Sequence, residues 1–173
     1  MGNEKEQYII GITGHRHLPT EKHSTIAADV KAFYQEAIKN HGAESITILS
    51  SLAEGADMLC AKLALDAGMR LVVPLPMNTL DYRKDFSESV ASEFDFFMSL
   101  ADQVFIVQPE EPITENHQRG FHYRQAGIYV AKHCDILLAV WDGIERDTLD
   151  GAGTWETVKL ARGMGKLIHC IKT

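Results

Sequence analysis

The sequence has no long apolar run, no closely spaced cysteines and no excess of basic residues. No apolar stretch approaches the roughly 18 residues that a membrane-spanning helix needs, and the polar start MGNEKEQYII lacks the pattern of a secretory signal. The three cysteines, Cys60, Cys134 and Cys170, are far apart and lie in apolar surroundings, which favours small buried side chains in a reducing compartment. We therefore expect a cytoplasmic protein with neither a membrane partner nor a metal site.

The charge balance is acidic. There are 17 Lys and Arg against 24 Asp and Glu, a formal net charge of −7. Affinity for nucleic acid depends largely on phosphate neutralisation by basic side chains, so this balance predicts that nucleic acid is an unlikely partner. The length of 173 residues and the 45% hydrophobic content suit one globular domain, and no linker or repeat divides the chain.

Short β-rich runs alternate with amphipathic helical patterns along the whole chain. Several runs, such as YIIGI and ILLAV, are apolar on both faces, which is typical of central parallel strands covered on both sides. The pattern predicts a doubly wound, mostly parallel, six-stranded α/β sheet with helices on both faces. The predicted strands are 8–13, 45–49, 70–74, 103–107, 135–141 and 166–171.

Two irregular segments, 108–116 and 142–150, follow predicted strands. Both should lie at the carboxyl edge of the sheet, where open α/β folds bind ligands. The second one leads into Gly151-Ala152-Gly153-Thr154 and a helix. Glycines before a helix let an anion approach the free amides of its first turn, so Gly151, Gly153 and Thr154 are candidate phosphate ligands. A flexible turn with Thr154 capping the helix is the structural alternative.

The segment GITGHRHL ends the first predicted strand with further candidates. Gly14 opens the backbone, and Arg16 can offer a planar fork to phosphate or form a structural ion pair. His15 is a candidate hydrogen-bonding residue, because His15 and His17 have no partners at metal-ligand spacing.

Two more segments add candidates at the same edge. In SSLAEGAD, Ser51 and Gly55 suit a second anion-binding turn, although capping of a helix explains the serine equally well. Tyr123 and Arg124 enter a helix and could stack a base and pair a phosphate, or the tyrosine could simply pack. The dipeptide Asp142-Gly143 follows the next strand, where the aspartate would bind a ribose hydroxyl or begin a turn.

These segments together resemble the SLOG superfamily, which unites the DNA-processing protein A (Smf) family and the Lonely-guy phosphoribohydrolases. SSLAEGADMLCAKLALDAG and GITGHR are similar to the Smf pattern, and CDILLAVWDG…GAGTWETV is similar to the Lonely-guy run that ends in Gly-Gly-x-Gly-Thr-x-x-Glu. The resemblance implies a stand-alone, Rossmann-like domain over residues 1–173, with a nucleotide phosphate near Gly14, Arg16, Ser51, Gly151, Gly153 and Thr154. Relatives often form dimers, and the neighbouring Phe96 and Phe97 suggest a homodimer through their helix.

The sequence departs from the hydrolase pattern at its catalytic acid. The position three residues after the threonine is Thr157, and the acid is one residue earlier, Glu156, which a helix turns by about 100°. The main hypothesis is therefore a domain that binds or senses a nucleotide or ADP-ribose-like ligand without a further cofactor. The alternative is a nucleoside 5′-monophosphate N-glycosidase with Glu156 or Asp142 as catalytic acid, and the third is a single-stranded DNA binder.

Overall fold

The computed structural model describes residues 6–113 and 118–173. Its six strands form one sheet in which every hydrogen-bonded pair is parallel, in the order β4-β3-β2-β1-β5-β6. The predicted fold class is confirmed, and the predicted strands agree with the observed ones to within one residue at either end. The strands are β1 (Tyr8–Gly14), β2 (Ile46–Leu49), β3 (Arg70–Leu75), β4 (Gln103–Ile106), β5 (Ile136–Trp141) and β6 (Leu167–Lys172).

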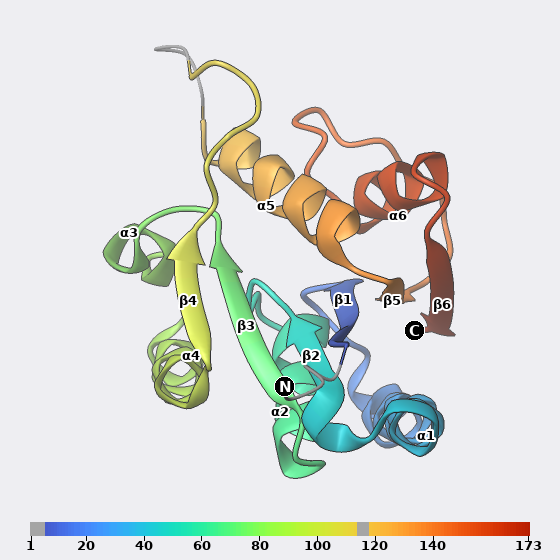
Figure 1. The fold of residues 1–173 in the computed structure, drawn as a ribbon. Helices are drawn as coiled ribbons and strands as arrows, with labels where there is room; N and C mark the ends of the chain where they lie inside the picture. Colours follow the sequence, from blue (N-terminus) through green and yellow to red (C-terminus); the bar gives the residue numbers. More distant parts are fainter. Residues whose placement is uncertain (1–5, 114–117) are drawn as a thin grey trace, which may run out of the picture.

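The helices cover both faces of the sheet (Figure 1). On one face lie α1 (His23–His41), α2 (Ala56–Asp66) and α4 (Glu88–Leu100), and on the other lie α5 (Arg119–His133) and α6 (Thr154–Gly163). The short helix α3 (Thr79–Arg83) follows β3, and two 3₁₀ turns, Thr20–Lys22 and Ala43–Ser45, lie at either end of α1. This two-sided cover explains why the central strands are apolar throughout.

The alternation of side chains along β5 shows how one strand supplies two cores. Leu138 and Val140 belong to the core under α1, α2 and α4, whereas Leu137, Ala139 and Trp141 belong to the core under α5 and α6. Successive side chains of a strand point to opposite faces, so a central strand must be apolar at every position. The run ILLAV satisfies this requirement.

The strand order places a topological switch point between β1 and β5. From β1 the chain moves outward through β2 and β3 to β4, and α5 then carries it back to β5 on the other side of β1. The connections leaving β1 and β5 therefore depart toward opposite faces, which opens a crevice at the carboxyl edge of the sheet. As predicted, the irregular segment 142–150 follows β5; residues 114–116 of the other segment lie outside the described residues.

Two further predictions concern the surface. Within the described residues, no helix combines the length and the apolar character that crossing a membrane requires. Phe97 is buried, 3% exposed, and packs on the sheet side of α4, whereas Phe96 is 59% exposed. Packing inside the protein thus explains Phe97 but not Phe96, and the homodimer stays a prediction.

Candidate functional site

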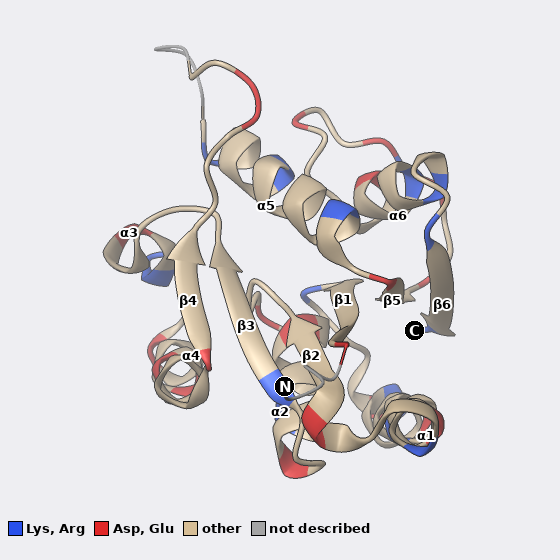
Figure 2. Cartoon of the chain, in the orientation of Figure 1, with Lys and Arg blue, Asp and Glu red and all other residues tan. Residues whose placement is uncertain are grey.

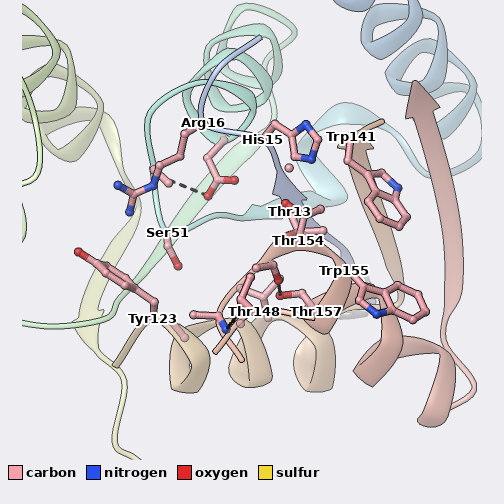
Figure 3. A pocket seen from close by; sticks show the side chains of 18 of the residues that line it. Thr13, His15, Arg16, Ser51, Tyr123, Trp141, Thr148, Thr154, Trp155 and Thr157 are labelled. Atoms are coloured by element: carbon pink, nitrogen blue, oxygen red, sulfur yellow. Dashed lines mark hydrogen bonds between the residues drawn. The ribbon is translucent and has the colours of Figure 1, made fainter. Parts of the chain in front are cut away.

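A cavity of about 530 Å³ occupies the carboxyl edge of the sheet at the switch point (Figure 3). Its walls come from the end of β1, the connections after β1, β2 and β5, one side of α5, and the first turn of α6. We call it the carboxyl-edge cavity. Its size is within the range of small-molecule sites.

The connections after β1 and β2 are fastened to each other beside the cavity. The amide of Ala56 donates to the carbonyl of His15 over 3.0 Å, and the amide of His15 donates to Val140 over 3.0 Å. A Cβ atom at Gly14 would lie 2.4 Å from the Cβ of Ala56, and one at Gly55 would lie 2.2 Å from a backbone oxygen. Both glycines are therefore required by close packing of the two connections. Gly14 also lines the cavity, but Gly55 does not.

Arg16 enters the cavity from the β1 connection. Its guanidinium lies over the ring of Tyr123 from α5, with the carbon Cζ 5.3 Å from the ring centroid. Within the described residues Arg16 forms no ion pair, and the buried hydroxyl of Tyr123 has no hydrogen-bond partner. Of the two roles predicted for Arg16, the structural ion pair is therefore absent from the described part of the chain. A guanidinium with free donors over an aromatic face is suited to an anion.

Ser51 lines the cavity from the turn after β2. Its hydroxyl donates to the carbonyl of Pro74 over 2.8 Å, so the serine oxygen is left as an acceptor toward the cavity. The next residue, Leu52, is fully buried with a φ of 55°, a conformation that a residue with a branched side chain adopts at a cost. The amide of Leu52 donates to the hydroxyl of Ser50 over 3.1 Å, which helps to hold this turn.

Asp57, in the first turn of α2, is a cavity residue that the sequence interpretation missed. Its carboxylate accepts a hydrogen bond from the Ser50 hydroxyl over 3.1 Å, and its side chain is only 7% exposed. Burial raises the pKa of Asp57 to about 6, although the Ser50 hydrogen bond, nearby amides and the charge of Arg16 act in the opposite direction. It lies within the segment SSLAEGAD, so an acid two residues after Gly55, in the first turn of the expected helix, was the available signal.

The first turn of α6 forms another wall. The helix begins at Thr154 after Gly153, and no side chain caps its amides, so these amides remain free to bind an anion. Thr154 and Thr13, from the end of β1, both line the cavity (Figure 3). Within the described residues, no hydrogen bond engages either hydroxyl. Two hydroxyls and a helix N-terminus are thus free to donate to the same ligand.

Glu156 does not lie in the cavity wall, where a catalytic acid would have to be. Its carboxylate accepts hydrogen bonds from the hydroxyl of Thr148, over 2.7 Å, and from the Thr148 amide, and Glu156 does not line the cavity. A Cβ atom at Gly153 would lie 2.5 Å from the Glu156 carboxylate. Glu156 therefore fastens the 142–153 connection to α6.

Asp142 lies at the rim and is engaged by its neighbours. Its carboxylate accepts from the amide of Ile144 over 3.0 Å, pairs with Arg146 over 2.8 Å and lies 3.7 Å from the ring of His15. The Ile144 amide and the charge of Arg146 hold the pKa of Asp142 below its usual range. Asp142 does not line the cavity, whereas His15 and Arg146 do. The aspartate thus orients two basic groups toward the ligand space.

Arg124 points away from the cavity wall. Its guanidinium makes two hydrogen bonds to the carboxylate of Glu111, over 2.9 and 2.8 Å, and lies 5.8 Å from the ring centroid of Phe121. The side chain of Arg124 lies against Gly151. A Cβ atom added at Gly151 would lie 2.9 Å from the Cδ of Arg124. Arg124, Gly151 and the turn residue Gly143 are all absent from the cavity lining.

The structure thus brings together about half of the predicted site residues. Those that line the cavity are Gly14, His15, Arg16, Ser51, Tyr123, Gly153 and Thr154, and those that do not are Gly55, Arg124, Asp142, Gly143, Gly151 and Glu156. The lining residues that the sequence interpretation missed include Thr13, Asp57, Trp141, Arg146, Thr148, Asp150 and Trp155. In the described part of the chain, no three His, Cys, Asp or Glu side chains are grouped as metal ligands would be.

Charge is balanced among the arginines and aspartates of the cavity, and basic residues are dispersed over the described part of the chain. Two arginines and two aspartates line the cavity: Arg16, Arg146, Asp57 and Asp150. In Figure 2, Lys and Arg are scattered among acidic residues rather than gathered along one element. Recognition at this site must therefore come from individually placed groups rather than from a broad basic surface.

Comparison with solved structures defines the fold class. The chain superimposes on DNA processing protein A from Streptococcus pneumoniae with a TM-score of 0.63 and 16% identity, covering 96% of this chain and 51% of that one. DNA processing protein A from Helicobacter pylori gives a TM-score of 0.61 and 13% identity, with 97% and 66% covered. The fold is that of the Rossmann-like part of these proteins, and this chain spans between about half and two thirds of their length. No protein-family model and no curated protein matches the chain in sequence.

These neighbours correct one prediction. The Helicobacter pylori protein is described as having a distinctive single-stranded DNA binding mode, so a protein of this fold does bind nucleic acid. The expectation that nucleic acid is an unlikely partner was therefore wrong. It was drawn from the net charge of −7, which averages over the entire surface and says nothing about a local site.

Proposed function

We propose that the carboxyl-edge cavity binds the phosphate group of a nucleotide. One observation supports this most strongly: Arg16 without an ion pair and the free hydroxyls of Thr13 and Thr154 face the same cavity as the uncapped first turn of α6. Each of these groups donates hydrogen bonds, and two of them carry positive charge or a positive dipole end. Phosphate is the anion for which such a set is best suited.

The aromatic residues of the cavity support a nucleotide rather than inorganic phosphate. Tyr123 lies under Arg16 on one side. On the other side the half-buried Trp155 stacks on Trp141, which is only 3% exposed, with ring planes 8° apart. Tyrosine and tryptophan faces accept nucleobases by stacking, at about 1–3 kcal/mol per base. The cavity therefore combines donors for a phosphate with apolar surfaces for a base.

The second candidate is that this nucleotide is one unit of single-stranded DNA. The fold shared with a protein described as a single-stranded DNA binder favours it. Arg16 over Tyr123 is the pairing of a phosphate ligand with a stacking platform that such binders use. N-glycosidic hydrolysis receives little support, because the Glu156 carboxylate is bound to Thr148 and lies outside the cavity lining.

Titration of wild type and two variants tests the proposal. The ligands are thymidine 5′-phosphate and a short, fluorescently labelled oligothymidylate, and the variants are Arg16→Ala and Arg70→Ala. Arg70 is the matched control because it pairs with Asp102 at the start of β3, at the opposite edge of the sheet. We expect Arg16→Ala to weaken binding at least about tenfold, the loss of one charge-assisted contact, and Arg70→Ala to leave it unchanged.

The outcomes separate the two candidates. Binding of the mononucleotide alone would confine the function to free nucleotides, and binding of the oligothymidylate, weakened by salt, would support the DNA candidate. If wild type binds neither ligand, or if both variants bind as wild type does, the proposed function is wrong.

A further inference from the structure

Asp57 is the most deeply buried charged side chain in the wall of the carboxyl-edge cavity. Asp150, the other acid of the lining, is exposed, and its carboxylate accepts from the Ala152 amide over 3.2 Å. Arg146 is engaged by Asp142 at the rim. Asp57 is therefore the one buried charge among the two arginines and two aspartates of the lining, and the charge of Arg16 acts on it.

Among the described residues, Arg16 is the cation whose charge acts on Asp57. The ionisable groups whose charge acts on it, or on which its charge acts, are Arg16 from the β1 connection, Tyr34 from α1, Cys60 from α2 and Tyr82 from α3. Burial raises the pKa of Tyr34, Cys60 and Tyr82 above their ordinary values, so all three are neutral at pH 7.5. The positive charge of Arg16 is thus already partly balanced by Asp57.

We propose that Asp57 is a specificity-determining residue that makes the cavity favour a singly charged phosphodiester over a doubly charged phosphomonoester. This inference rests on the proposed function, because it assigns the ligand class of the same site. The phosphate that Arg16 attracts must share the cavity with the Asp57 carboxylate. A second negative charge on that phosphate adds repulsion that Arg16, already partly neutralised, does not offset.

Burial makes this repulsion effective. Asp57 is only 7% exposed, and a charge in such surroundings interacts with a neighbouring charge several times more strongly than it would in bulk solvent. A phosphomonoester, with its second pKa near 6, is mainly a dianion at pH 7.5, whereas a phosphodiester carries one charge at any physiological pH. The difference between the two ligands at pH 7.5 is therefore one unit charge at the same place.

The hydrogen bonds of Asp57 can be separated from its charge. The Ser50 hydroxyl donates to the Asp57 carboxylate over 3.1 Å and accepts from the Leu52 amide, so Asp57 also helps to hold the turn that places Ser51. Ser50→Ala removes this link and keeps the carboxylate. Because the Ser50 hydrogen bond lowers the pKa of Asp57, Ser50→Ala and wild type are compared at pH 8.5, where the carboxylate stays ionised. Asp57→Asn removes the charge and keeps an oxygen that accepts hydrogen bonds. Charge and turn geometry are thus altered by different variants.

The test compares thymidine 5′-phosphate with its methyl ester, which has the same base and sugar but one charge fewer, at pH 7.5. Isothermal titration of wild type should give about tenfold tighter binding of the methyl ester. Asp57→Asn should reduce this preference to within about threefold, whereas Ser50→Ala, compared with wild type at pH 8.5, should retain it. Asp66→Asn, the same change at the exposed end of α2, is the matched control and should also retain it. If Asp57→Asn does not fold, Asp57→Ser is titrated in its place.

Each result decides the inference. A wild-type preference for the dianion, or an unchanged preference in the Asp57 variant, overturns it while leaving the proposed function intact. Loss of the preference in Ser50→Ala assigns the effect to turn geometry and also overturns the role of charge. Failure of wild type to bind either compound is a failure of the proposed function itself, and the inference falls with it.

Discussion

The guanidinium of Arg16 lies over the ring of Tyr123, 5.3 Å from its centroid, so that a residue from the first strand connection and one from α5 meet across the carboxyl-edge cavity. These two elements are brought together by the switch point between β1 and β5. In our proposal, Arg16 of this pair binds a phosphate and Tyr123 offers an aromatic surface for a base.

This pair leads to a prediction about Tyr123. Tyr123→Leu should weaken nucleotide binding about three- to tenfold, because it removes the surface on which Arg16 is stacked. Tyr123→Phe keeps the ring and removes a buried hydroxyl that lacks a partner within the described residues, so its binding should equal that of wild type and its melting temperature should not fall. Titration and thermal unfolding measure both effects; weaker binding by Tyr123→Phe would contradict the stacking role.

Glu156 is expected to stabilise the 142–153 connection. Glu156→Ala should lower the free energy of unfolding by about 1–3 kcal/mol, since it removes two hydrogen bonds from Thr148 to a carboxylate. Amide hydrogen exchange should accelerate at residues 144–152. Glu145→Ala is the control, because its exposed ion pair with Arg162 contributes little. Equal exchange in the two variants would show that Glu156 does not fasten the connection.

Gly55 is expected to tolerate no side chain. Its φ is +87°, and a Cβ atom there would lie 2.2 Å from the carbonyl oxygen of Arg16, so Gly55→Ala must displace the connection that carries Arg16. We expect a loss of at least about 2 kcal/mol in unfolding free energy. Gly163→Ala, where nothing lies within 4 Å of the new Cβ, should unfold at the same or a higher temperature. Denaturant titration compares the two, and equal midpoints would refute the packing role of Gly55.

The burial of Asp57 predicts how stability depends on pH. Its pKa is raised to about 6 in the folded protein from 3.8, so the folded state binds more protons than the unfolded state between these values. The contribution of Asp57 to stability is therefore fully present below about pH 4 and is lost as the pH rises through 6. The melting temperature of Asp57→Asn relative to wild type should rise between pH 4 and pH 7. A difference that stays constant over this range would show that the carboxyl is not buried as described.

Most of the fold could be predicted from the sequence because central parallel strands have a distinctive pattern. A strand covered on both faces must be apolar at every position, and the runs YIIGI and ILLAV meet that condition without knowledge of their partners. The position of a ligand site at the carboxyl edge followed from the alternation of strands and helices. Neither inference required any side chain to be placed.

The individual site residues were harder to predict because their roles depend on the course of the connections. The sequence does not reveal that the chain between Asp142 and Gly153 folds back so that Thr148 reaches Glu156, or that Arg124 turns to Glu111. Gly55 was expected to face a ligand, yet it faces a backbone oxygen. Contacts between segments that are distant in the sequence determine these orientations. The spacing of residues within one motif does not indicate such contacts.

The central claim is that a nucleotide phosphate binds between the first strand connection and the start of α6. Its most direct test is a ¹⁵N-resolved NMR titration of the wild-type protein with the methyl ester of thymidine 5′-phosphate, followed by the oligothymidylate. We expect the amide signals of His15, Arg16, Thr154 and Trp155 to shift first and together, and the shifts of His15, Thr154 and Trp155 to need at least about tenfold more ligand in Arg16→Ala. Shifts confined to another surface, or none at millimolar ligand, would contradict the claim.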